Sequence, residues 1–465
     1  MTTQPTQPLP RTDDVVGALD LSPGALDRTI ARLALPSVVE NVLITTIFMV
    51  NSLFVGWLGD PGALAAVGVA GILTWVLSAP FDALGMGIVP IVARAWGRND
   101  LQSARHAGAQ AISLSLVLGV AMVALIWPFT DWLFRLMGLE PHVVQIGGDY
   151  MRWVLTTSWI SMPLIVFNAI MRGTGDTRTP MWITGSMNIF NLMVAYPLIF
   201  GLGPIPSMGL VGAGMATAIA RFFGSALALT VLLLGWSAIR IPWRTALCWD
   251  GALVATMVRL SLPAAGEQLI QRTGSMIYTR VIAALGTVAL AAHQIGVRIE
   301  SFSFNPGYGM ALAASTMAGQ ALGAGRPDLA ERSIKRTTFF AAVAMSALGI
   351  VFLFFGPRMA GVFGVTPEVL SLAGLIIQIS ALEQPALAVS GTLAGGMRGA
   401  GDTRTPMLVN AVGTLVFRLP IVYLTGIVLG WGLPGVWVGT AVDWTLRAAM
   451  MAWVFRRGHW KAVHV

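Results

Sequence analysis

Long apolar runs recur along the whole chain and are separated by short polar connections. They lie near residues 30–57, 64–93, 107–130, 145–170, 181–202, 208–236, 255–284, 288–321, 338–363, 367–396, 406–430 and 433–455. A helix needs roughly 20 residues to cross a bilayer, and these runs are long enough. A helix also satisfies its own backbone hydrogen bonds in lipid, whereas a transmembrane barrel would show short alternating strands. The pattern predicts an all-α polytopic membrane protein with twelve transmembrane helices.

One motif occurs twice, at residues 171–181 and 397–407. Both copies read Met-Arg-Gly-X-Gly-Asp-Thr-Arg-Thr-Pro-Met, where X is Thr174 or Ala400. Other blocks repeat in the same order, so the chain divides into two related halves. Six runs per half is an even number, and both halves therefore enter the membrane in the same direction. We expect two six-helix lobes related by a pseudo-twofold axis along the membrane normal, with a functional cavity between them.

The predicted domain boundaries follow from this repeat. The lobes are expected at residues 22–245 and 246–458. Residues 1–21 are polar and rich in proline and aspartate, and lack the apolar core of a signal peptide, so they are interpreted as a disordered cytosolic tail. Residues 459–465 form a second cytosolic tail.

The composition agrees with a membrane protein and indicates its orientation. Charged residues make up 11% of the chain, about half the fraction of a soluble protein. The net charge of +8 comes from basic residues at the ends of apolar runs, which is a sign of topology and not of nucleic-acid binding. Among the arginines and lysines of the connections and tails, only Arg135, Arg152 and Arg358 fall on one side of the membrane, and the others fall on the opposite side. The positive-inside rule predicts that both termini lie in the cytosol. We expect a multi-pass protein of the cell inner (plasma) membrane.

Several of the repeated blocks resemble the multidrug and toxic compound extrusion (MATE) transporters. The most specific are Val-Gly-Trp-Leu-Gly at 55–59, Leu-Ala-Ala at 64–66, the block at 286–294 and the two Arg-Gly-X-Gly-Asp-Thr loops. The resemblance covers nearly all of the chain from Leu33 to Arg457. It implies twelve helices in two lobes, V-shaped in the outward-open state, that export amphiphilic, often cationic compounds in exchange for protons or sodium ions. The expected partners are these small molecules, the coupling ion and membrane lipid, for a monomer without a cofactor or a nucleic-acid partner.

One position departs from the family pattern. Family members usually carry an aspartate in the first helix where this chain has Asn51. An amide can coordinate a sodium ion, which would place a sodium site near Asn51, but an amide cannot titrate. A proton relay is therefore not expected to pass through this position, and the coupling site is sought elsewhere.

Acidic residues inside the spans are candidates for coupling, because a charge in the hydrocarbon core is costly. Glu40 and Glu267 occupy equivalent places in the first helix of each half. At helical spacing Glu40 aligns with Asn51, and Glu267 aligns with Tyr278, with Gln271 between them. The alternative is that both glutamates lie near the cytosolic ends and bind loop donors or helix termini.

His293 and Glu300 lie seven residues apart, hence on one helix face, and could share a proton near neutral pH. The alternative is a structural histidine, with Glu300 paired to a nearby arginine. The arginines in these two spans are Arg272, Arg280 and Arg298, and an internal ion-pair network with Glu267 and Glu300 would accommodate them.

Further polar residues in the spans are candidates for lining the cavity. They are Asp82, Asn188, Asn191, Tyr278, Gln271, Glu383 and Arg418. Glu383 stands two residues before a proline that predicts a kink. Asp443 and Arg447 are four apart and are expected to pair with each other. In the repeated loops, Thr179 and Thr405 are expected to cap the following helices, and the aspartates to bind nearby backbone.

Two other functions remain open. A lipid-linked oligosaccharide or lipid flippase of related fold would need a cationic cavity, which Arg272, Arg280, Arg298 and Arg418 could supply. A membrane-embedded transferase would need clustered aspartates, but the only adjacent acidic pair is Asp13-Asp14 in the polar tail. An enzyme is therefore not expected. The chain also lacks a nucleotide-binding phosphate loop, so nucleotide is not expected to drive transport, which favours a secondary transporter.

Overall fold

The computed structural model describes residues 24–204, 206–242 and 249–463. The predicted tail at 1–21, with Asp13 and Asp14, and the lobe boundary at 245/246 lie outside the described residues.

The first half forms the N-lobe, eight helices and a connecting turn. They are α1 (Leu26–Gly56), α2 (Pro61–Gly97), α3 (Leu101–Ile126), the turn η1 (Trp127–Phe129), α4 (Thr130–Leu136), α5 (Pro141–Ser161), α6 (Leu164–Gly173), α7 (Arg178–Phe200) and α8 (Gly209–Leu234). Helices α3 and α4 form one span through the turn, and α5 and α6 form another that breaks at Pro163.

The second half forms the C-lobe. Its elements are α10 (Gly251–Ala283), α11 (Thr287–Gly323), α12 (Pro327–Gly361), α13 (Pro367–Ser380), α14 (Gln384–Gly399), α15 (Arg404–Val412), η2 (Gly413–Arg418), α16 (Leu419–Tyr423), η3 (Leu424–Val428), α17 (Gly432–Arg457) and η4 (His459–Ala462). The kink expected beside Glu383 is confirmed, because α13 and α14 meet at an angle of 53°.

Length and apolarity alone identify eight helices in the described residues that could cross a membrane, or nine if the bent pair α13 and α14 counts as one span. The other three spans of the predicted twelve are α10, α11 and α17. These helices carry most of the ionisable residues named as candidates above, and their charged side chains make them less apolar than the other spans.

The helices extend beyond several of the apolar runs that predict them. The clearest case is α12, which begins at Pro327, well before the predicted start at 338. Its first turns are charged and therefore do not belong to the hydrocarbon core, yet nothing prevents a helix from continuing into the polar headgroup region. The apolar pattern marks the hydrocarbon-spanning part of a helix and not its end.

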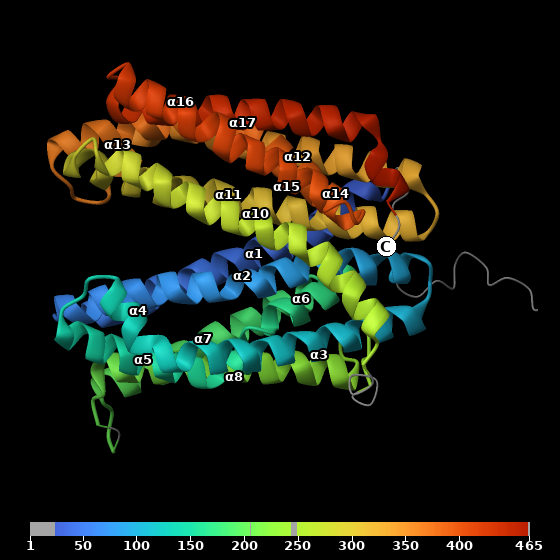
Figure 1. Ribbon diagram of the computed structural model, residues 1–465, viewed down its shortest axis with the longest axis horizontal. Helices are drawn as coiled ribbons and strands as arrows, with labels where there is room; N and C mark the ends of the chain where they lie inside the picture. The colour runs from blue at the N-terminus through green and yellow to red at the C-terminus, as the bar shows by residue number, and fades with distance from the viewer. Residues whose placement is uncertain (1–23, 205, 243–248, 464–465) are drawn as a thin grey trace, which may run out of the picture.

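The two lobes lie side by side and diverge toward one end of the molecule (Figure 1). They meet near the end that holds the C terminus, which we call the closed end. The start of α1 packs into the core of the C-lobe, where Leu26, Ile30 and Leu33 are buried. Met257 and Leu260 of α10 are buried in the core of the N-lobe in the same way. The first helix of each lobe therefore begins in the core of the opposite lobe, and this exchange holds the two lobes together at the closed end.

Candidate functional site

Each lobe holds one buried glutamate in its first helix, bound by an arginine and an amide. In the N-lobe, the Glu40 carboxylate accepts hydrogen bonds from Arg172 at 2.7 Å and Asn168 at 3.0 Å. Glu40 is fully buried, so this pairing with the last turn of α6 compensates a charge removed from water.

The C-lobe repeats this arrangement with one difference. Glu267 accepts hydrogen bonds from Arg398 at 2.5 Å and Asn410 at 2.6 Å. The arginines occupy the same place in the two repeated loops, but the amide comes from α15 in the C-lobe and from α6 in the N-lobe. The alternative interpretation of the glutamates, binding to loop donors, is the one that this geometry favours.

In the helices that follow the repeated loops, an aspartate and not a threonine binds the backbone amide of the first turn. The helix α7 begins at Arg178, so Thr179 is already inside it, and Asp176 accepts from the Thr179 amide at 3.0 Å. In the second loop Asp402 accepts from the Thr405 amide at the same distance. The prediction that Thr179 and Thr405 cap these helices is wrong, because each helix starts at the arginine two residues before the proline, so both threonines lie inside it. The expected bonds from the aspartates to backbone are confirmed.

A dense charge cluster lies inside the C-lobe. Asp443 is fully buried and binds two arginines. Arg447 donates to both carboxylate oxygens at 2.7 and 2.8 Å, as expected from the helical spacing, and Arg418 donates from the π-helical turn η2 at 2.8 Å. Arg447 also donates to Thr414 at 3.2 Å. One carboxylate thus holds two guanidinium groups together between α17 and η2.

Two more carboxyl groups lie beside these arginines. Glu300 and Glu383 interact with each other, and both feel the charge of Arg418. Glu383 is fully buried, and neither of its oxygens has a well-formed hydrogen bond within the described residues. Gln384 connects this pair to the rest of α11 by accepting from Ser303 at 2.5 Å. We call Glu300, Glu383, Arg418, Asp443 and Arg447 the C-lobe charge cluster.

The C-lobe charge cluster has an unequal charge count. Three carboxyl groups face two guanidinium groups, and none of the five side chains is more than 20% exposed. With every group ionised, the cluster carries one excess negative charge in a low-dielectric site. A proton or another monovalent cation would balance it.

The N-lobe has no counterpart of this cluster. Aligning the two repeated motifs places Thr74 and Thr157 where the C-lobe has Glu300 and Glu383. The shared Gly-Leu-X-Gly starts of α8 and α17 place Ala220 and Gly224 opposite Asp443 and Arg447. The charges therefore belong to one half of the pseudo-symmetric molecule.

Arg447 fits into the C-lobe because the residue that faces it there is a glycine. In the N-lobe the large and the small residue of the equivalent pair have changed places. In the C-lobe, a Cβ on Gly413 would lie 2.2 Å from Arg447. In the N-lobe, a Cβ on Gly224 would lie 2.9 Å from the sulfur of Met187, the residue equivalent to Gly413. The large side chain comes from the last helix in one lobe and from the fifth span in the other.

His293 and Glu300 do not meet in the described structure. His293 packs edge-on against Tyr278 and Trp437, with ring centroids 5.4 and 5.7 Å apart. The environment is that of a buried structural histidine. Tyr278 lies 3.2 Å from Thr440, and in the N-lobe Asn51 lies 3.5 Å from the equivalent Thr217. Asn51 and Tyr278 thus occupy equivalent positions in the two lobes and contact equivalent threonines.

Arg272 joins the lobes and does not pair with the glutamates, contrary to the expected network. It donates to the Trp75 and Val76 carbonyls of α2 at 2.5 and 3.1 Å, and stacks 4.0 Å from the Trp75 ring. Its distance to Asp82 is 3.8 Å. Because Pro80 has no N–H, the Val76 carbonyl lacks its helical donor, and Arg272 supplies one from the opposite lobe.

The two asparagines of α7 are buried rather than central to the cluster. Asn188 donates to the Leu43 carbonyl at 2.7 Å and lines a crevice of about 370 Å³ between α1 and α7. Asn191 is also buried. Gln271 is partly buried and donates to Glu267 at 3.5 Å, so it belongs to that glutamate's surroundings.

At the closed end, α2 and α11 cross through reciprocal contacts of glycine with backbone. A Cβ on Gly97 would lie 2.1 Å from the Gln320 carbonyl, and one on Gly323 would lie 2.2 Å from the Arg94 carbonyl. Arg94 donates to Ala400 of the C-lobe at 2.7 Å, and Gln320 donates to Gly173 of the N-lobe at 3.0 Å. We call this the α2–α11 crossing. It leaves no room for a side chain between the lobes.

The prediction omitted several residues that the structure brings into these sites. Arg172 and Arg398 are not among the candidates from the sequence, although their recurrence at the end of each fourth span could have indicated a fixed partner. Asn168 and Asn410 gave no signal, because their places in the repeat differ.

The family model described as MatE matches residues 36–197 and again residues 263–424. The two matches cover more than half of the chain and reproduce its two halves.

Relatives and solved structures align with nearly the whole chain. It is 29% identical over 438 residues to the probable multidrug resistance protein NorM of Thermotoga maritima, across 93% of each protein. It is 26% identical over 403 residues to the FAD transporter of Shewanella oneidensis, across 86% of this chain and 88% of that one. A solved structure described as the outward-facing conformation of a multidrug resistance MATE family transporter gives a TM-score of 0.88 at 23% identity, covering 96% of this chain and 99% of that one.

Proposed function

The chain belongs to the MATE family of efflux transporters, and on this premise we propose that it is a secondary antiporter that exports amphiphilic, mainly cationic small molecules in exchange for protons or sodium ions. It works by alternating access in the plasma membrane, with both termini and the closed end facing the cytosol. The divergence of the lobes away from the closed end supports an outward-facing state (Figure 1).

The observation that carries this proposal is the unequal charge count of the C-lobe charge cluster. A coupling ion needs a site that it stabilises when bound and that is under-neutralised when empty. Glu300 and Glu383 form such a site beside Arg418, which is already shared with Asp443. The site does not require a titratable group at Asn51, where the family aspartate is missing.

Substrate coupling follows from the same charges. A cation that binds between Glu300 and Glu383 removes their repulsion and allows α11 and α14 to approach. When the ion leaves, the excess negative charge favours an arrangement in which the carboxyl groups separate or attract a cationic substrate. The bend between α13 and α14, directly at Glu383, is the place in this lobe where such a change can be accommodated.

The test is transport of a fluorescent cationic dye in proteoliposomes with independently set sodium and pH gradients. We expect Glu300→Gln and Glu383→Gln to abolish gradient-driven transport. The exposed Glu140→Gln serves as the matched control and should transport as the wild type does. Full coupling in both cluster variants would contradict the assignment of the site, and no dye movement under any gradient in the wild type would contradict the antiporter.

A further inference from the structure

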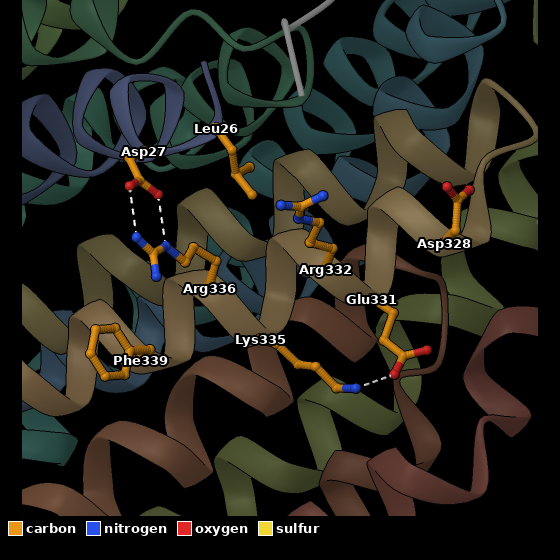
Figure 2. Close-up of a pocket in the computed structure, with 8 residues that line it drawn as sticks. All are labelled: Leu26, Asp27, Asp328, Glu331, Arg332, Lys335, Arg336 and Phe339. Carbon is orange, nitrogen blue, oxygen red and sulfur yellow. Dashed lines mark hydrogen bonds and ion pairs between the residues drawn. The ribbon is translucent and has the colours of Figure 1, made fainter. Parts of the chain in front are cut away.

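A crevice of about 750 Å³ lies between the first turns of α1 and α12 at the closed end (Figure 2). None of its lining residues belongs to the C-lobe charge cluster, and the transport mechanism proposed above makes no use of it. Charged side chains form most of its walls, and Phe339 lies at its edge.

The carboxylates of the crevice are already neutralised. Asp27 is bound by Arg336 through two hydrogen bonds of 2.8 Å, which Figure 2 shows as a pair of dashed lines. Glu331 is bound by both Lys335 and Lys461. Two ammonium groups thus share one carboxylate, and the surplus is positive.

Arg332 is the remaining cation. Asp328 pairs with Arg326 at 3.0 Å and is therefore not available to it. Within the described residues no hydrogen bond or ion pair joins Arg332 to another side chain, and in Figure 2 its guanidinium group is drawn between Leu26 and Asp328 without a dashed line. Its charge acts, together with the Arg336 hydrogen bonds, on the Asp27 carboxylate, so it is close to a carboxylate that Arg336 already binds. The crevice therefore presents a guanidinium group with no hydrogen-bond partner of its own in the described residues, and a net positive charge.

The basic residues continue a lipid-facing stripe of α12. Arg332, Arg336, Phe339, Val343 and Ile350 recur at helical spacing on one face. The last three are 55%, 51% and 58% exposed and apolar, as expected for side chains that contact acyl chains. At 1.5 Å per residue, Arg336 lies roughly 5 Å and Arg332 roughly 10 Å along the axis from Phe339. This spacing matches the depth of a headgroup region above the hydrocarbon core.

We propose that this crevice binds the headgroup phosphate of an anionic phospholipid. Arg332 donates to the phosphate oxygens, Lys335 adds a second positive charge, and the acyl chains lie along Phe339, Val343 and Ile350. Charge complementarity selects an anionic headgroup, and the apolar stripe directly beneath the cations selects a lipid over a soluble anion.

The pseudo-equivalent place in the N-lobe carries a carboxylate and lacks the two arginines. His106 and Gln110 stand where the C-lobe has Arg332 and Arg336. His106 lies 3.0 Å from the Asp250 carboxylate, and Gln110 accepts from the Asp250 amide at 3.1 Å. The His106 hydrogen bond holds the pKa of Asp250 below its ordinary range, so this carboxylate stays ionised and repels phosphate. The lipid site is therefore expected on one lobe only.

The experiment titrates dihexanoyl phosphatidylglycerol into the full-length protein in a neutral detergent and measures binding by calorimetry. Each basic residue near an anionic lipid surface contributes roughly 1 kcal/mol, so we expect Arg332→Gln and Lys335→Gln each to weaken binding about fivefold. The control is Arg105→Gln, which removes an exposed cation from the equivalent turn of α3 and should leave the affinity unchanged. The melting temperature of each variant without lipid checks that the fold is intact.

Two further titrations distinguish the source of the phosphate. Dihexanoyl phosphatidylcholine and inorganic phosphate should both bind at least tenfold more weakly than phosphatidylglycerol. Equal binding of the two lipids, inorganic phosphate binding as tightly as phosphatidylglycerol, or unchanged affinity in both α12 variants would each overturn the proposal. Because the readout is binding and not transport, its failure is separate from a failure of the antiporter.

Discussion

At the scale of single residues, similar carboxyl groups have different surroundings and so different expected functions. Glu40 and Glu267 each accept hydrogen bonds from an arginine and an asparagine through one carboxylate oxygen, while the second oxygen has no hydrogen-bond partner in the described residues. We therefore expect both glutamates to stabilise their lobes. Neither oxygen of Glu383 has a comparable donor, and Glu383 lies next to another carboxyl group. The sequence predicted that all of these residues were candidates, but it could not rank them, because their partners come from other helices, which for Glu40 and Glu267 lie more than a hundred residues away.

This difference gives a prediction for Glu40→Gln and Glu267→Gln. Each substitution leaves an arginine that is mostly buried without its counterion, and breaking a buried pair costs about 3 kcal/mol. We expect a lower melting temperature in detergent for both variants, with coupling to the ion gradient retained in the protein that remains folded. Loss of coupling without any loss of thermal stability would instead make these glutamates the coupling groups.

At the scale of helices, the apolar pattern predicted twelve spans and their order, and the repeat predicted the two lobes. It did not predict where α12 begins or how the arginines of α10 are used. A helix end depends on headgroup contacts and loop geometry, and Arg272 depends on a carbonyl freed by Pro80 in the other lobe. Neither is visible in the local sequence.

The contact between α10 and α2 gives a prediction at this scale. In Arg272→Gln the Val76 carbonyl loses its donor, at a cost of about 1.4 kcal/mol, so amide exchange in α2 around residues 75–82 should rise about tenfold. Adding Pro80→Ala supplies the missing helical N–H and should reverse most of that rise. Arg280→Gln, on the same helix but exposed, is the control. Hydrogen–deuterium exchange that stays unchanged in Arg272→Gln would show that this arginine does not hold α2.

At the scale of the whole molecule, the two lobes are held at the closed end by exchanged helix starts and by the α2–α11 crossing. Both features are reciprocal, so the closed end keeps the pseudo-symmetry that the C-lobe charge cluster has lost. Opening at this end requires the backbones at Gly97 and Gly323 to separate.

The α2–α11 crossing predicts matched effects for Gly97→Val and Gly323→Val. Either side chain would collide with backbone, so both variants should favour a conformation open at this end and transport more slowly. The measurement is the rate of maleimide labelling of a cysteine placed at Ser315 in a Cys248→Ser background, which we expect to rise at least fivefold. Gly391→Val, where a Cβ would meet open space, is the control. Labelling that stays slow in both variants would mean that the crossing does not control access.

The exchange of Met187 and Gly224 for Gly413 and Arg447 has a consequence for how the protein arose. A side chain at Gly413 would collide with Arg447, and one at Gly224 would collide with Met187, so the two positions of each pair had to change together after the halves became separate. A hybrid built from two first halves should therefore still assemble and shut, but it would lack the electrostatic imbalance that we propose binds the coupling ion. On that proposal, duplication supplied the frame, and a paired difference between the copies supplied its link to an energy source.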